Sequence, residues 1–115
     1  MSRDYKVYLD DILEAIAWIR TYTTGLSYEA FQGDRKTVDA VVRNLEVIGE
    51  AVKQIPESIR LQYPDIDWKK IAGLRDVLIH NYFGIDLELI WDIVENKLTS
   101  LEERVNQILS EGESV

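Results

Sequence analysis

The residues with the clearest catalytic chemistry lie together in the stretch GLRDVLIHNYFGID. Arg75, His80 and Tyr82 form an R-x4-H-x-Y arrangement, in which Asp76 follows the arginine and Asn81 precedes the tyrosine. A histidine with a pKa near neutrality can take or give a proton, and a guanidinium can hold a phosphate through two parallel hydrogen bonds. Without a metal, this chemistry suits cleavage of RNA, whose ribose 2′-OH supplies the nucleophile.

Helical geometry divides these side chains between two directions. At about 100° per residue, Arg75 and Tyr82 fall within about 20° of each other, and Asp76 and His80 within about 40°. Asp76 could therefore orient His80 or raise its pKa. Arg75 and His80 are about 140° apart, so one straight helix does not aim both at one small group. A distorted helix, a long reach by Arg75, or a second copy of the chain would bring them together.

His80 also has a simpler interpretation. A lone histidine late in an amphipathic helix is more often a surface or interface residue than a catalyst. It is the only histidine of the chain, and there is no cysteine, which excludes a histidine-rich or thiolate metal site within one chain. We therefore expect neither a metal ion nor a cofactor, and the spacing alone does not identify an enzyme.

Four amphipathic helices must position this stretch. Apolar spacing predicts them over about residues 4–22, from Asp34 to Pro56, from Trp68 to about Phe83, and from Asp86 into the EGESV tail. A short helical turn is expected at 57–63, and no strand pattern competes. The sequence thus predicts an all-α, up-down helical bundle with short loops.

The predicted helices carry their own start signals and apolar stripes. Asp34, Asp67 and Asp86 are expected to be N-caps, because their carboxylates can accept hydrogen bonds from free backbone N–H groups. The predicted core face comprises Tyr5, Tyr8, Leu9, Ile12, Ile16, Ile19, Tyr22, Val38, Val41, Leu45, Ile48, Val52, Ile55, Ile71, Leu74, Leu78, Leu87, Ile90, Val94, Leu98, Leu101, Val105 and Ile108.

Length and charge limit the classes of function. The chain has 115 residues and a net charge of −8, and we expect one domain over 1–115. No long apolar run or signal peptide is seen, so a cytoplasmic protein without a membrane segment is expected. The acidic balance argues against an extended nucleic-acid surface. Residues 35–75 carry +2 and residues 76–115 carry −7, so a polyanion site is expected near the middle segment.

Several aromatic and apolar residues favour structural roles. Trp18, Trp68 and Trp91 lack the basic neighbours of a base-stacking surface, so we interpret them as core or interface residues. Val47, Ile79 and Trp91 lie off the main apolar stripes, which leaves them available for a second surface. That surface would suit a homodimer.

Two charged pairs are interpreted as solvated faces. Glu46 and Glu50 form an i, i+4 acidic pair that could be half of a metal site, but no histidine is near them in the sequence. Lys69 and Lys70 could extend a phosphate track beside Arg75. For both pairs the solvated face is the favoured interpretation.

The stretch from Asp39 to Asp86 resembles the HepT family of HEPN-superfamily proteins, which are toxins of prokaryotic toxin–antitoxin pairs. It reads DAVVRNLEVIGEAVKQIPESIRLQYPDIDWKKIAGLRDVLIHNYFGID. The specific features are R-[ND]-x-x-x-H-x-Y-F-G and the upstream RN-x-x-x-IGEA helix. The helices before and after fit the same pattern, so the resemblance covers nearly the whole chain.

The resemblance implies an all-α, HEPN-like homodimer whose paired R-x4-H motifs face a common cleft and act as a metal-independent endoribonuclease. On this basis Arg75 would bind or stabilise the scissile phosphate, and His80 would be the acid or base. Asp76 and Asn81 would support them, and position 76 holds Asn or Asp in the family. Tyr82 would be the residue that a cognate antitoxin, a minimal nucleotidyltransferase of the MntA type, modifies with AMP.

A second function of a different class stays open. The chain could be a non-catalytic helical dimer that serves as a binding or regulatory partner of a nucleotidyltransferase. Arg75 and His80 would then be interface or nucleotide-contact residues. Cleavage of RNA by the purified, unmodified protein separates the two hypotheses.

Overall fold

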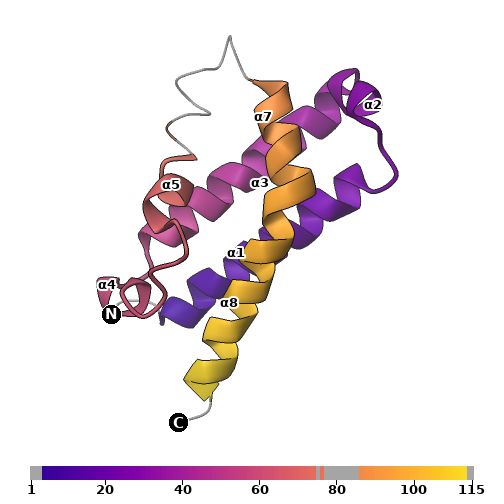
Figure 1. Ribbon diagram of the computed structural model, residues 1–115. Coiled ribbons are helices and arrows are strands. Elements are labelled where there is room, and N and C mark those ends of the chain that lie inside the picture. The colour runs from indigo at the N-terminus through magenta and orange to yellow at the C-terminus, as the bar shows by residue number, and fades with distance from the viewer. Residues whose placement is uncertain (1–3, 75, 77–85, 114–115) are drawn as a thin grey trace.

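The computed structural model describes residues 4–74, 76 and 86–113, and every regular element in this part is a helix (Figure 1). The predicted all-α class is therefore confirmed. The elements are α1 (Tyr5–Thr23), α2 (Tyr28–Gln32), α3 (Arg35–Lys53), α4 (Glu57–Arg60), α5 (Trp68–Ala72), α7 (Leu87–Asp92), the π-helix η1 (Ile93–Lys97) and α8 (Leu98–Glu113). None of the helices in this part is long and apolar enough to cross a membrane.

Helices α1 and α3 form the main packing contact of the fold. Helix α1 also contacts α8, while α3 also contacts α2 and α5. Helices α7, η1 and α8 follow one another without a break and run across α1 (Figure 1). The three long helical segments thus share one apolar core, and α2 and α5 pack on α3 at its edge.

The core consists of the predicted stripes of these helices. The fully buried large side chains are Leu9, Ile12, Ile16, Ile19, Phe31, Val41, Leu45, Ile48, Val52, Ile55, Ile90 and Leu98. All except Phe31 were expected on the core face from their spacing. Phe31 belongs to α2, a short helix between the first two predicted helices. The hydroxyl of Ser27 caps it by accepting a hydrogen bond from Ala30 N–H (3.1 Å).

Tyr22 is a predicted core residue that the structure places at the surface. Its side chain is 38% exposed, whereas Thr23 is buried and its hydroxyl donates to the carbonyl of Ile19 at 2.9 Å. The buried face of α1 thus continues from Ile19 to the residue four positions on, and Tyr22, three positions on, falls to one side. Helix α1 ends as predicted at Thr23, and Gly25 then adopts a φ of 80°.

The three predicted aspartate caps are confirmed. The backbone N–H of Thr37 donates to Asp34 at 3.3 Å, and the Asp67 and Asp86 carboxylates each accept from the residue three positions later at 3.1 Å. These bonds satisfy N–H groups that have no partner inside a helix. The starts of α3, α5 and α7 are therefore determined by local sequence.

Helix α5 is shorter than predicted. It ends at Gly73, whose N–H donates to the carbonyl of Lys69 at 3.0 Å, and Leu74 and Asp76 are helical again. Glycine is about 1 kcal/mol less favourable than alanine inside a helix, which accounts for an interruption at this position. The rest of the helix predicted to about Phe83 lies outside the described residues.

The predicted last helix contains a π-helical segment, η1. Ile90 and Leu98 are both buried, although they are eight positions apart. On a regular α-helix their side chains would point about 80° away from each other. The wider π turn reduces this rotation. The apolar stripe then continues in α8 with Val105 and Ile108, which are buried as predicted.

Candidate functional site

Most residues of the predicted site lie outside the described part of the chain. Arg75, His80, Asn81 and Tyr82 are in this group, so their roles stay predictions. Asp76 alone is described, and its side chain is exposed on a helical residue. The structure does, however, define the elements from which this segment starts and to which it returns.

Helix α5, which leads into the segment, is anchored in the core. Trp68 is buried, and its indole N–H donates to the carbonyl of Tyr63 at 3.0 Å. The core role predicted for this tryptophan is confirmed. Lys69 and Lys70 are exposed on the same short helix, in agreement with the predicted solvated face. The helix therefore presents a positively charged side to solvent directly before Arg75.

A second set of contacts fixes the loop before α5. The phenol of Tyr63 donates a hydrogen bond to the carboxylate of Glu111 on α8, and the guanidinium of Arg104 lies 5.7 Å from the centre of the Tyr63 ring. Arg104 also forms an ion pair with Asp65 at 2.7 Å. We call Tyr63, Asp65, Arg104 and Glu111 the α8 clasp. It ties the start of the α5 segment to the last helix.

The clasp changes the ionisation of both groups in its central hydrogen bond. Donation to Glu111 and burial together raise the pKa of Tyr63 to about 12. The same hydrogen bond, with a second from Gln107, lowers the pKa of the Glu111 carboxyl. At neutral pH the pair is therefore a neutral phenol and a carboxylate, which is the arrangement that the hydrogen bond needs.

Helix α7, which follows the segment, begins at the Asp86 cap and is anchored by aromatic packing. Ile90 is buried, and the Trp91 ring lies 4.9 Å from the ring of Phe31 and 6.2 Å from that of Tyr28. Trp91 is half-buried and packs on the core of its own chain, as does Val47. The core role predicted for Trp91 is therefore confirmed in part. The second surface predicted for Val47, Ile79 and Trp91 stays a prediction, and Ile79 lies outside the described residues.

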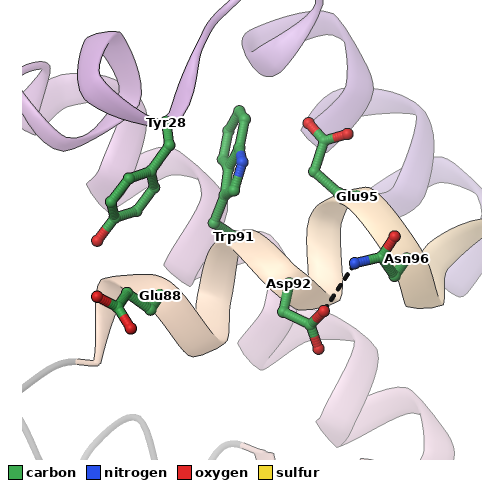
Figure 2. A pocket seen from close by; sticks show the side chains of 6 residues that line it. All are labelled: Tyr28, Glu88, Trp91, Asp92, Glu95 and Asn96. Carbon is green, nitrogen blue, oxygen red and sulfur yellow. Dashed lines mark hydrogen bonds between the residues drawn. The ribbon is translucent and has the colours of Figure 1, made fainter.

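Beside Trp91 the surface has a hollow of about 400 Å³ between α2 and the α7–η1 segment (Figure 2). Its lining residues are Tyr28, Glu88, Trp91, Asp92, Glu95 and Asn96. Sequence reasoning did not single it out. The signal was present, because Glu88, Asp92 and Glu95 follow one another at spacings of four and three and so share a helix face.

Two further expectations concern the outer surface. Trp18 is 47% exposed and stacks on Tyr22 with ring centres 5.9 Å apart, so it is not a core residue. Its predicted alternative role at an interface is not tested. Glu46 and Glu50 are half-buried rather than fully solvated, and no group of three or more acidic, histidine or cysteine side chains in the described ranges could hold a metal ion.

Comparison with known proteins identifies the family. The family model described as "Ribonuclease HepT-like" matches residues 12–108. A protein of Thermococcus cleftensis named "Probable ribonuclease HepT" is 43% identical over 94% of this chain and 98% of its own length. A protein of Methanocaldococcus jannaschii named "Putative RNase MJ0127" is 46% identical over 97% of this chain and 93% of its own length. No solved structure matches the chain.

The fold and these matches define the class as an all-helical protein related to ribonucleases. The chain belongs to the HepT-like ribonuclease family. The resemblance read from the stretch Asp39 to Asp86 is thereby confirmed.

Proposed function

We propose that the protein is an endoribonuclease that needs no metal ion and whose catalytic residues are Arg75 and His80. The observation that carries the proposal is the family match, because residues 12–108 include the whole R-x4-H-x-Y stretch. The relatives named as ribonucleases align over nearly their full length, which supports the same class of activity here.

The proposed reaction uses the RNA's own hydroxyl. His80 removes the proton from the ribose 2′-OH, the 2′ oxygen bonds to phosphorus, and the bond from phosphorus to the 5′ oxygen breaks. A protonated group returns a proton to the leaving 5′ oxygen. Arg75 holds the charged oxygens of the phosphate in the transition state. The products are a 2′,3′-cyclic phosphate and a 5′-hydroxyl end.

The second proton-transfer group is best supplied by a homodimer. On a straight helix Arg75 and His80 would point about 140° apart, so one copy of the motif would aim them at different places. Two copies facing a common cleft would place the partner subunit's His80 opposite, where it protonates the leaving oxygen. The supporting residues are Asp76, for the orientation of His80, and Asn81.

The anchoring of α5 and α7 supports a site at this end of the bundle. The Asp67 and Asp86 caps and the buried Trp68 and Ile90 fix the helices on both sides of the segment. Lys69 and Lys70, exposed in the turn before Arg75, add positive charge where an RNA strand would approach.

We further propose that the protein is the toxin of a toxin–antitoxin pair in the cytoplasm. Its antitoxin would be a minimal nucleotidyltransferase that attaches AMP to Tyr82. On a regular helix, Tyr82 would fall on the same face as Arg75. An added phosphate would therefore occupy the guanidinium and repel the RNA backbone.

A non-catalytic role as a regulatory partner of the nucleotidyltransferase is the second candidate. The observation that favours it is charge, because the net charge of −8 and the −7 of residues 76–115 weaken RNA binding. In this case the unmodified protein would bind the nucleotidyltransferase and leave RNA intact.

The test is cleavage of end-labelled RNA by purified, unmodified protein in excess EDTA. We expect cleavage by the wild type and a loss of about 10²-fold or more in His80→Ala and Arg75→Ala. Glu103→Gln, an exposed change on α8, is the matched control and should cleave normally. Circular dichroism verifies that each variant is folded.

The same assay separates the alternatives. Equal cleavage by the wild type and both motif variants would contradict the assignment of the site. Loss of activity on adding EDTA would contradict metal independence. A folded, unmodified wild type that leaves RNA intact while it binds the nucleotidyltransferase would favour the regulatory role.

A further inference from the structure

The hollow beside Trp91 has a floor of aromatic rings held in place by the core. In Figure 2 Trp91 stands between Tyr28 and Glu95, and Asp92 and Asn96 form the lower rim. The Trp91 ring packs on Phe31, which is completely buried, and Ile90 beside it is 1% exposed. We call the six lining residues the aromatic hollow. Its floor is thus preformed and does not need a ligand to order it.

The rim of the hollow is negatively charged. Glu88, Asp92 and Glu95 are all exposed, and among the described residues no lysine or arginine forms an ion pair with them. Asp92 accepts a hydrogen bond of 2.7 Å from Asn96, which positions one carboxylate at the rim. Elsewhere on the surface, Arg20 and Arg104 do pair with carboxylates. The charge of the hollow is therefore open to an external cation.

Tyr28 responds to this negative field. Its pKa is raised, first by desolvation and then by the charges of Glu88 and Asp86. The phenol therefore stays protonated at neutral pH and offers a neutral aromatic face and one hydroxyl. A cation in the hollow would contact aromatic rings and carboxylates together.

The side chain that suits both features is arginine. A guanidinium stacks on tryptophan or tyrosine rings and forms paired hydrogen bonds with a carboxylate. A metal ion is disfavoured, since the carboxylates of the described segments form no cluster that could hold one. The volume of about 400 Å³ admits one or two side chains rather than a whole domain.

We propose that the aromatic hollow is a docking site for an arginine-bearing basic segment of a partner protein. Such a segment is complementary in charge, because residues 76–115 carry −7 and the rim carboxylates form no ion pair within the described part of the chain. A second copy of this chain, with the same net charge of −8, is a poorer occupant. The proposal does not depend on the ribonuclease activity.

The experiment follows the three indole N–H signals of the full chain by nuclear magnetic resonance. A capped Gly-Arg-Gly-Arg-Gly peptide is added, and the same peptide with citrulline in place of arginine is the ligand control. We expect the Trp91 signal to shift and saturate with the arginine peptide, while Trp18 and Trp68 stay in place. The citrulline peptide should leave all three unchanged, because citrulline keeps the shape of arginine without its charge.

Two double variants separate a site from a general charge effect. Glu88→Gln with Glu95→Gln should weaken the apparent affinity about fivefold. Glu57→Gln with Glu103→Gln changes the net charge by the same amount, at exposed positions on α4 and α8. This second double variant should leave the affinity for the peptide unchanged. All four are surface glutamates, so folding is preserved.

Three results would overturn the proposal. The first is a Trp91 signal that does not move. The second is an equal loss of affinity in both double variants. The third is a Trp91 signal that shifts on raising the concentration of the protein alone, which would assign the hollow to a second copy.

Discussion

Tyr63 donates a hydrogen bond to Glu111, a residue 48 positions later in the chain. This contact joins the loop before α5 to the last helix, and Arg104 reinforces it by its ion pair with Asp65. The proposed catalytic arginine, Arg75, follows the end of α5 after two residues. The α8 clasp therefore anchors the helix that precedes the R-x4-H motif.

Removing the phenol tests the clasp. Tyr63→Phe keeps the ring under Arg104 but deletes the hydrogen bond, and we expect the free energy of unfolding to fall by about 1 kcal/mol. Urea denaturation measures this loss. Tyr22→Phe is the control, because Tyr22 is 38% exposed and its ring stack with Trp18 survives the change. A loss of the same size in the control would contradict a specific role for Tyr63.

Acid should weaken the clasp through Glu111. Its folded-state pKa is lowered by the hydrogen bonds from Tyr63 and Gln107, so its stabilising contribution is present above the ordinary value of 4.5. The contribution is lost as the pH falls through the folded-state pKa. Unfolding of the wild type and of Glu111→Gln should therefore differ at pH 7 and converge in acid. A difference that does not change with pH would show that the carboxylate charge is not involved.

The core could be predicted from the sequence, because helix spacing alone places Leu9, Val41 and Leu98 on buried faces. The aspartate caps were predictable for the same reason, since a cap is a local interaction. Tyr22 is placed wrongly, because a stripe with spacings of three and four does not decide whether Tyr22 or Thr23 continues the buried face after Ile19. Tertiary packing makes that choice.

The functional surroundings were less predictable. Helix α2 is only five residues long, and its buried Phe31 packs against Trp91 of a distant helix. The aromatic hollow also combines Tyr28 of α2 with residues of α7 and η1. The pairing of Tyr63 with Glu111 likewise joins two distant segments, and no periodicity in one segment predicts it. The motif residues stand out by their types and spacing, but their predicted roles come from the resemblance to the HepT family.

The shared-cleft mechanism predicts a homodimer at micromolar concentration. The exposed Trp18 and Tyr22 pair on α1 provides apolar surface outside the core. Sedimentation velocity should give about twice the chain mass of 13.3 kDa. A protein that cleaves RNA as a monomer would contradict the role given to the partner subunit's His80.

Neutralisation by the antitoxin predicts a covalent change at Tyr82. After co-expression with a cognate nucleotidyltransferase, the intact mass should rise by units of about 329 Da, the mass added by one AMP. Peptide mapping should place the addition on Tyr82, and Tyr82→Phe should gain no mass. Full neutralisation of a protein with unchanged mass would favour inhibition by complex formation.

In the proposed cleavage reaction, the RNA 2′-OH is the nucleophile and His80 removes its proton. The most direct measurement compares an RNA oligonucleotide with the same oligonucleotide carrying 2′-O-methyl groups, in excess EDTA, with product ends identified by mass spectrometry. We expect the wild type to produce 2′,3′-cyclic phosphate ends from RNA only, and His80→Ala to produce almost none. Cleavage of the methylated strand, or 5′-phosphate ends that persist in EDTA, would contradict metal-independent attack by the 2′-OH.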